Sequence, residues 1–357
     1  MKKESRFSRR DFIKGAAAAF GAPQILRGAP VGANSRINVA MIGTGNQGSH
    51  DTRAFLAEPD VQVVAVCDVN HASHGYKTDT QFLGRQPVRE MVEKYYGAQR
   101  RSGTYHGCDS YSDFRDVIAR KDVDVVGIVT PDHWHAIIAI RAAAAGKDIY
   151  CEKPLSLTVE EGRAMADAVK RYGVVLQTGT HHRSSPRLRF VCELVRNGRI
   201  GQLKRMVAYV PGWNKMGPAS DWRPMPVPEG FDYEMWLGPA PFEPYHKDRC
   251  LYNFRFILDY SGGQVTNTGA HSIDLAQWAH GSDRWGPVEV EDAGSEWPVD
   301  GLFNVATKVA FRARYEDGVI LECAQTDEPL ACRFEGTEGF VQTGYWTSGL
   351  LCDPPSL

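Results

Sequence analysis

The segment that decides the fold is Arg36-Ile37-Asn38-Val39-Ala40-Met41-Ile42-Gly43-Thr44-Gly45-Asn46-Gln47-Gly48. Its apolar first half predicts a buried β-strand, and its end follows the pattern Gly-x-Gly-x-x-Gly. A helical stretch over 49–58 and a second apolar strand over 61–67 come next, and that strand ends at Asp68. This order, a strand, a glycine turn, a helix, a second strand and an acidic residue, is typical of a dinucleotide-binding βαβ unit.

Each glycine of this turn has a structural role. Gly43 permits the tight turn, Gly45 lets a pyrophosphate approach the backbone, and Gly48 lets the helix pack closely against the strand. The helix N-terminus adds free N–H groups and a positive dipole end for the phosphates. Asp68 is expected to accept hydrogen bonds from ribose hydroxyls, and its carboxylate favours NAD over NADP because it repels a 2′-phosphate. The other cofactor contacts expected in the turn are Thr44, Asn46 and Gln47.

Helices and apolar strands continue to alternate further along the chain. The expected elements are, in order, a helix over 111–120, a strand over 123–129, a helix over 135–145, a strand over 148–151, a helix over 158–171 and a strand over 174–177. This alternation predicts an α/β fold with a doubly wound parallel sheet, whose ligands bind beyond the carboxyl ends of the strands. Residues at those ends should converge on one crevice; they are Gly43, Asp68, Thr130, Lys153 and Gln177. Residues 70–109 read as a polar, partly helical insertion, to which we assign no function.

The first 33 residues resemble a twin-arginine export signal. Arg9 and Arg10 lie in a basic, polar start, a weakly apolar stretch follows over 15–22, and Val31-Gly32-Ala33 is a small-x-small cleavage pattern. A disordered basic N-terminus with a chance arginine pair is the alternative. We expect export by the twin-arginine machinery to the periplasm or beyond, with cleavage near Ala33.

Composition excludes several classes of protein. The chain has 357 residues, of which 43% are hydrophobic and 24% charged, as in an ordinary globular protein of two domains. Residues 1–33 hold seven of the 41 basic and two of the 43 acidic residues, so the remainder has a net charge of −7. That charge is poorly suited to nucleic acid or an anionic membrane. The sequence has no run of about 18 apolar residues, so we expect no stable membrane insertion.

The eight cysteines are scattered and form no Cys-x-x-Cys pair. A zinc ribbon or a redox dithiol is therefore unsupported. We expect buried free thiols, with Cys323 and Cys332 as the nearest candidates for a disulfide.

Three further motifs accompany the glycine turn. They are Thr130-Pro131-Asp132-His133-Trp134-His135, Glu152-Lys153-Pro154 and Gly262-Gly263-Gln264-Val265-Thr266-Asn267-Thr268-Gly269-Ala270-His271-Ser272-Ile273-Asp274. In this combination the chain resembles the Gfo/Idh/MocA family of oxidoreductases, from about Ile37 to Val341. The resemblance implies an N-terminal NAD(P)-binding Rossmann domain, placed at 34–155. It also implies a C-terminal α/β domain, placed at 156–357, whose open, mostly antiparallel sheet covers a sugar pocket and mediates homo-oligomers.

The resemblance also implies the catalytic groups. Lys153 matches the family's active-site lysine, which would hydrogen-bond the reacting hydroxyl and lower its pKa. His271 matches the catalytic histidine, a general acid/base whose ordinary pKa lies near neutrality. Many members carry Asp at the position of Asn267, and the amide keeps the hydrogen bonding but loses the charge. Asp274 could orient His271 or form a helix salt bridge. The alternatives are a surface lysine in a strand-end turn and a satisfied core histidine.

Further contacts are expected around these groups. The cofactor contacts implied by the motifs are Thr130, Pro131, His135, Glu152 and Lys153. The candidate substrate contacts are Gln177, His181, His182, Arg183, Trp213, Trp222 and Arg223, although each tryptophan could instead belong to the core. A metal site built from His133, His135, His181 and His182 is conceivable, but no spacing demands it and we expect no metal.

The predicted function is an exported oxidoreductase that acts on sugars, polyols or glycosides by hydride transfer, with NAD favoured over NADP. Nicotinamide cofactors are not expected to be free outside the cytoplasm, so the protein would carry a tightly bound cofactor that is reset in place. Paired oxidation and reduction of two sugars satisfies this requirement. An NAD-dependent glycosidase, working by oxidation, elimination, hydration and re-reduction, is the alternative, and a non-catalytic sugar or dinucleotide sensor is the third reading.

The C-terminus departs from the family pattern. The chain stops at Leu357, soon after a strand-like stretch at 339–341, whereas long relatives continue with further sheet and a final helix. We expect a short member of the family or a truncated gene product.

Overall fold

A six-stranded parallel sheet forms the first half of the computed structural model, which describes residues 36–212, 219–345 and 349–356. Its strands are β1 (Ile37–Ile42), β2 (Val61–Cys67), β3 (Asp109–Tyr111), β4 (Val125–Ile128), β5 (Asp148–Cys151) and β6 (Leu176–Thr178). They lie in the order β3-β2-β1-β4-β5-β6, and every pair is parallel. The order reverses between β1 and β4, which is where doubly wound folds open a crevice for ligands.

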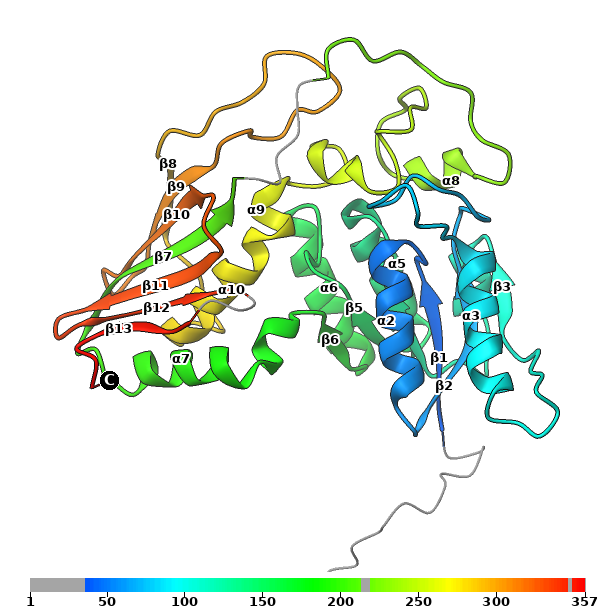
Figure 1. Ribbon diagram of the computed structural model, residues 1–357, viewed down its shortest axis with the longest axis horizontal. Coiled ribbons are helices and arrows are strands. Elements are labelled where there is room, and N and C mark those ends of the chain that lie inside the picture. The colour runs from blue at the N-terminus through cyan, green and yellow to red at the C-terminus, as the bar shows by residue number, and fades with distance from the viewer. Residues whose placement is uncertain (1–35, 213–218, 346–348, 357) are drawn as a thin grey trace, which may run out of the picture. The chain divides into compact units, whose positions relative to one another are not determined.

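Helices pack on both faces of this sheet (Figure 1). They are α2 (Asn46–Ala57), α3 (Arg85–Gly97), α4 (Phe114–Ile118), α5 (Asp132–Ala144) and α6 (Val159–Tyr172). Successive side chains of a strand point to opposite faces. Val39 and Met41 of β1 therefore join the apolar residues of α2 and α3. Ala40 and Ile42 join those of α4, α5 and α6. The predicted doubly wound α/β architecture is confirmed.

The second half of the described chain is built on a seven-stranded sheet. Its strands are β7 (Leu203–Pro211), β8 (Glu289–Asp292), β9 (Ala310–Arg314), β10 (Ile320–Thr326), β11 (Leu330–Gly336), β12 (Phe340–Gly344) and β13 (Leu351–Asp353). They lie in the order β13-β12-β11-β7-β10-β9-β8, and among these described pairs β7 and β10 alone are parallel. The expected open, mostly antiparallel sheet is confirmed.

The short elements of this half lie between the two sheets in sequence or follow β7. They are η2 (His181–Ser184), α7 (Pro186–Arg196), α8 (Tyr233–Leu237), η3 (Asn253–Phe256), α9 (Gln264–Asn267) and α10 (Gly269–His280). The apolar sides of α7 and α10 pack on one face of the seven-stranded sheet, against residues such as Met206 and Phe334. This packing fixes the N-terminal end of α10, which carries His271.

The parallel sheet extends past the domain boundary predicted at 155/156. Helix α6 packs on this sheet, and β6 pairs with β5 from Leu176 opposite Ile149 to Thr178 opposite Cys151. The helix predicted over 111–120 is also shorter than expected. Its first residue, Tyr111, instead ends the edge strand β3, and the side chain of Asp113 caps α4 by accepting a hydrogen bond from the backbone N of Arg115.

All eight cysteines are free thiols. Cys323 on β10 and Cys332 on β11 both lie opposite Ala208, on the two sides of β7, and are not bonded. Within the described ranges, no helix has the length and apolar character needed to span a bilayer. The predicted export signal at 1–33 and Trp213 lie outside the described residues.

Candidate active site

A cavity of about 510 Å³ lies at the point where the strand order of the parallel sheet reverses. The carboxyl ends of β1, β2, β4 and β5 form one side, and residues of η3, α9 and α10 form the other. Twelve of the residues predicted for the site line it, namely Gly43, Gly45, Asn46, Gln47, Asp68, Thr130, Pro131, Glu152, Lys153, His181, Asn267 and His271. The convergence of strand ends on one crevice is thus observed, except for Gln177.

Asp68 ties the glycine turn to the end of β2. Its Oδ2 accepts hydrogen bonds from the backbone N of Thr44 at 2.7 Å and from Thr44 Oγ1 at 3.0 Å. Its Oδ1 accepts from the backbone N of Asn70 at 2.8 Å. Burial raises the pKa of Asp68, while these three hydrogen bonds act to lower it. Thr44 therefore holds the carboxylate in place from below instead of lining the cavity.

Two glycines of the turn cannot carry a side chain. Gly43 has φ +90°, and a Cβ on Gly48 would lie 2.0 Å from the carbonyl oxygen of Gly43, so neither position accepts a side chain. Within the described chain, the buried Oγ1 of Thr130 on the cavity wall has no hydrogen-bond partner. A tight glycine turn, a carboxylate at the end of the second strand and an orphaned hydroxyl fit a bound NAD.

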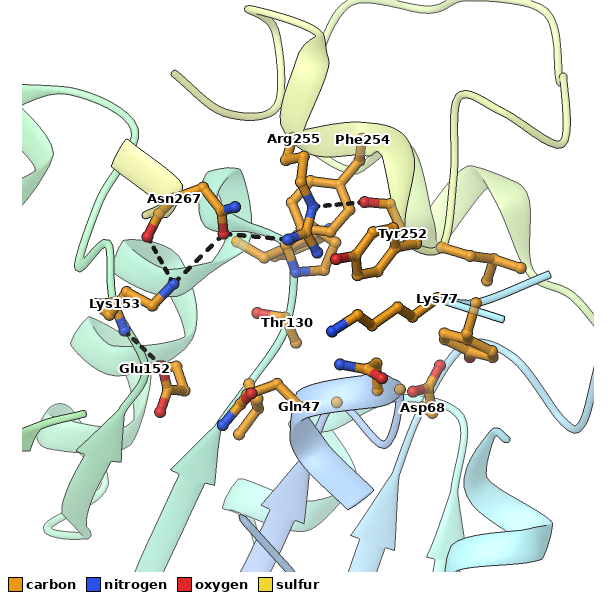
Figure 2. A pocket seen from close by; sticks show the side chains of 18 of the residues that line it. Gln47, Asp68, Lys77, Thr130, Glu152, Lys153, Tyr252, Phe254, Arg255 and Asn267 are labelled. Carbon is orange, nitrogen blue, oxygen red and sulfur yellow. Dashed lines mark hydrogen bonds between the residues drawn. The ribbon is translucent and has the colours of Figure 1, made fainter. Parts of the chain in front are cut away.

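The polar insertion contributes residues to this cavity that sequence reasoning missed. Tyr76 packs against Gly45, and its hydroxyl accepts a hydrogen bond from Asn70 Nδ2 at 2.9 Å. Gln81 donates to Asn46 Oδ1 at 2.8 Å. Figure 2 shows Lys77 reaching into the cavity from the side of Asp68. Residues 76–81 therefore lie over the glycine turn.

At the opposite end of the cavity, two cations share one amide. Lys153 Nζ donates to the backbone O of Asn267 at 2.9 Å and lies 3.5 Å from its Oδ1. Arg255 Nη1 donates to the same Oδ1 at 3.1 Å, and Arg255 Nε donates to the backbone O of Tyr252 at 2.7 Å (Figure 2). Burial lowers the pKa of both cations, and the charge of Arg255 lowers that of Lys153 further. Sequence reasoning missed Arg255 because it lies outside the motifs.

Behind Lys153, Glu152 belongs to a buried acidic pair. Glu152 Oε2 accepts from the backbone N of Lys153 at 3.1 Å, and its Oε1 accepts from Tyr150 at 3.1 Å. Burial raises the pKa of Glu152 and that of the neighbouring Asp51. These hydrogen bonds orient the strand-end turn that carries Lys153.

Three histidine rings lie against one another near Lys153, and those of His182 and His271 are stacked. The ring of His271 lies 4.4 Å from that of His182 and 4.7 Å from that of His181, measured between centroids. Burial, followed by the nearby Lys153 charge, lowers the pKa of His271 to about 2. Burial lowers the pKa of His182 to about 4 and also lowers that of His181. All three rings are therefore neutral at pH 7, and His271 Nδ1 has no hydrogen-bond partner in the described part of the chain.

The histidine set considered for a metal in the sequence does not assemble. His133 contacts the backbone O of Trp236 at 3.1 Å. His135 contacts the backbone O of Thr130 at 2.8 Å and that of Pro154 at 2.7 Å, so it braces the two strand-end motifs from behind the cavity wall. The structure groups His181, His182 and His271 instead, with ring nitrogens within 4.8 Å of one another, an arrangement that could hold a metal ion.

Five predicted substrate contacts do not line the cavity: His182, which lies against His271, and Gln177, Arg183, Trp222 and Arg223. Arg183 donates to both carboxylate oxygens of Asp274 and to Asp283, which also takes Asp274 away from His271. Gln177 donates to the backbone O of Thr178 at 2.9 Å. Trp222 packs in an aromatic cluster under Arg249, and Arg223 donates to the backbone O of Trp222 at 3.0 Å. Each of Gln177, Arg183, Trp222 and Arg223 thus makes its contacts within the fold, outside the lining of the cavity.

Comparison with protein-family models supports the reading of both halves. Residues 37–180 match the model described as "Oxidoreductase family, NAD-binding Rossmann fold". Residues 187–350 match "Oxidoreductase family, C-terminal alpha/beta domain". The predicted NAD-binding Rossmann domain is confirmed.

Individual relatives include enzymes of sugar metabolism. A levoglucosan dehydrogenase of Pseudarthrobacter phenanthrenivorans is 35% identical over 184 residues, which cover 50% of this chain and 42% of the relative. A glycosyl hydrolase family 109 protein of Saccharopolyspora erythraea is 27% identical over 56% of this chain and 45% of its own length. The chain spans about half the length of the curated relatives it matches.

Among solved structures, a levoglucosan dehydrogenase in complex with NADH and levoglucosan superposes with a TM-score of 0.59 at 25% identity. The match covers 87% of this chain and 74% of that one. The GenD2 protein from gentamicin A biosynthesis, in complex with NAD, superposes with a TM-score of 0.61 at 21% identity, over 87% of this chain and 73% of that one. That second likeness concerns the fold alone.

Proposed function

Because this chain belongs to the Gfo/Idh/MocA family of oxidoreductases, we propose that it is an NAD-dependent oxidoreductase acting on hydroxyl or carbonyl groups of a sugar, polyol or glycoside. One observation carries the proposal: Lys153 and His271 line the same cavity as the glycine turn and Asp68. The similarity of this chain to a levoglucosan dehydrogenase supports a carbohydrate substrate.

The cofactor and the substrate divide the cavity between them. Gly43, Gly45 and the start of α2 would hold the phosphates, and Asp68 would hold a ribose. Bound NAD supplies the hydride acceptor. The substrate would occupy the other end, between Lys153, Asn267 and His271, with the carbon–hydrogen bond to be broken facing the hydride acceptor.

Lys153 and His271 are placed to assist removal of the proton from the reacting hydroxyl. The Lys153 ammonium donates a hydrogen bond to the substrate oxygen and stabilises negative charge that develops there. Burial keeps the His271 ring neutral, so a ring nitrogen can accept the proton. From His271 the proton passes on toward solvent. His181, whose ring centroid lies 4.7 Å away, is the exposed member of the histidine group and leads to solvent.

Export belongs to the same proposal and rests on the sequence of residues 1–33. A protein that leaves the cytoplasm folded must retain its NAD, and the segment over the glycine turn, with Tyr76 and Lys77, suits that need. Replacing Arg9 and Arg10 by lysine should leave the protein in the cytoplasm. Its appearance in the periplasm regardless would refute twin-arginine export.

Net hydrolysis is the second candidate function. A glycosyl hydrolase family 109 protein is among the relatives of this chain. A cofactor that is oxidised and reduced within one cycle also needs no second sugar. The two functions differ in their products, since a glycosidase cleaves a glycoside without net formation of NADH.

Assembly into a homo-oligomer is also part of the proposal. Helices α7 and α10 cover one face of the seven-stranded sheet, and the other face carries Arg205 paired with Glu322 and Glu335. Light scattering of the purified protein decides the assembly state.

The proposed function is tested first by denaturing the purified protein and identifying any released nucleotide by mass spectrometry. Stoichiometric NAD, together with its reduction when sugars or glycosides are added, is the expected result. A protein that neither retains NAD nor binds it when added would overturn the redox assignment.

A further inference from the structure

Resting on the function proposed above, we infer that the substrate is an acidic sugar, whose carboxylate binds Arg255 while its reacting hydroxyl meets Lys153. The inference comes from the charges at the substrate end of the cavity. Lys153 and Arg255 meet there at the neutral amide of Asn267. The phosphates of the dinucleotide are assigned to the opposite end of the cavity, at the glycine turn.

Arg255 is held rigidly and presents one free edge. Nε is fixed by the backbone O of Tyr252, Nη1 by Asn267 Oδ1, and the guanidinium lies 3.8 Å from the centre of the Tyr252 ring. Nη2 donates to none of the residues that the structure describes. A guanidinium fixed in this way has already lost the rotamer freedom that binding would otherwise cost. It can therefore receive a ligand without rearrangement.

Arg255 and Lys153 meet no carboxylate in direct contact among the described side chains, although the charge of Asp132 acts on both and that of Glu152 acts on Lys153. Neither forms a salt bridge there, although buried carboxyl groups lie nearby. Asp132 instead accepts a hydrogen bond from Ser261 Oγ at 2.5 Å. Glu152 is engaged by Tyr150 and by the backbone of Lys153. Two cations that are partly removed from water are costly unless an anion joins them, and both side chains line the cavity.

Asn267 is the residue that leaves this charge uncompensated. An aspartate there would place a carboxylate against both Arg255 Nη1 and Lys153 Nζ, because the amide oxygen already contacts the first at 3.1 Å and lies 3.5 Å from the second. With Asn267 in place, the compensating charge has to come from the ligand. An amide nitrogen in place of one carboxylate oxygen thus makes the site suited to an anionic sugar instead of a neutral one.

A carboxylate fits this site better than a tetrahedral anion. A planar guanidinium edge matches the two coplanar oxygens of a carboxylate, which it can bind through two parallel hydrogen bonds. The amide of Asn267 stands between the cations and keeps the carboxylate and the reacting hydroxyl within one sugar ring of each other. Hexuronic acids and their glycosides have this arrangement.

The test compares matched substrates on the purified protein with its NAD. The probes are methyl glycosides of glucuronic and galacturonic acid, their uncharged methyl esters, the parent neutral glycosides and the corresponding 6-sulfates. We expect kcat/KM for the free acid to exceed that for its methyl ester by tenfold or more, the size of a charge-assisted hydrogen bond. Asn267→Asp and Arg255→Gln should each remove this preference, mainly through KM, whereas the exposed Arg223→Gln should keep it.

The outcomes separate this inference from the proposed function. Equal turnover of acids and neutral sugars would overturn the acidic substrate and leave the oxidoreductase standing. A preference for the 6-sulfates would overturn the carboxylate. If no sugar is oxidised, the proposed function fails, and calorimetric titration of the NAD-loaded protein with the uronosides still decides the binding claim. Weakened NAD binding in Arg255→Gln, with the acid preference intact, would assign Arg255 to the cofactor and refute the inference.

Discussion

Lys153 Nζ donates a hydrogen bond to the backbone carbonyl oxygen of Asn267 at 2.9 Å, across 114 residues of sequence. The lysine stands at the end of β5 in the parallel sheet, and Asn267 ends α9, just before the helix that carries His271. This bond sets the spacing between the two groups assigned to the chemistry. The active site therefore depends on how the two halves of the molecule pack together, as well as on the residues of either half.

The first prediction concerns this pair. Lys153→Met removes the donor to the substrate oxygen, and His271→Asn removes the proton acceptor. Each should lower kcat by about 10²- to 10⁴-fold, the usual contribution of a positioned acid or base. NAD should remain bound in both, because the phosphate and ribose contacts lie at the other end of the cavity.

The matched controls are Lys121→Met and His106→Asn, which change exposed residues of the same types. Both should retain full activity. Loss of bound NAD in the two active-site variants would indicate a structural role for these residues, and unchanged turnover in them would refute the site assignment.

The second prediction concerns pH. Burial lowers the pKa of Lys153 from an ordinary value of 10.5. If the ammonium form is the active one, kcat/KM falls as the pH rises through this lowered pKa, so the alkaline limb appears below pH 10.5. Lys153→Arg keeps its proton at any accessible pH. Residual activity in that variant should lose the limb, and an alkaline limb unchanged by the substitution would assign it to another group.

The sequence alone predicts the parallel sheet and most of the nucleotide end because those features are local. The turn from Gly43 to Gly48 and the acid at Asp68 are read from one continuous pattern, and Lys153 follows from a strand end. Arg255 and Lys77 carry no such signal, since Arg255 lies on the short helix η3 and Lys77 in the polar insertion, and tertiary packing brings both to the cavity. Arg183 shows the reverse error: it follows a strand end but turns to Asp274 and Asp283.

The third prediction concerns the coupling of Asp68 to the glycine turn. Asp68→Ala removes a ribose acceptor and also releases the backbone N and the hydroxyl of Thr44. NAD affinity should fall by about 10- to 100-fold, as expected for lost hydrogen bonds to a charged group. Discrimination against NADP should weaken because the repelling carboxylate is gone.

Thr44→Val separates the two effects, since it removes only the hydroxyl contact at 3.0 Å and keeps the carboxylate. It should weaken NAD binding less than Asp68→Ala and preserve the preference for NAD. Fluorescence titration of cofactor-stripped protein with each nucleotide measures both constants, and identical behaviour of the two variants would argue against the coupling.

The fourth prediction concerns retention of the cofactor. Lys77 lies on the cavity wall and forms no ion pair with any residue in the described ranges, so its ammonium is available to the dinucleotide phosphates. A single charge-assisted contact of this kind is worth about tenfold. Lys77→Ala should therefore raise the dissociation rate of NAD about tenfold, measured by exchange into excess unlabelled nucleotide. Lys121→Ala, which changes an exposed lysine far from the glycine turn in sequence, should leave the rate unchanged.

Because the contact is electrostatic, raising the salt concentration should speed release from the wild type more than from Lys77→Ala. Equal salt dependence in the two proteins would show that Lys77 does not bind the phosphates.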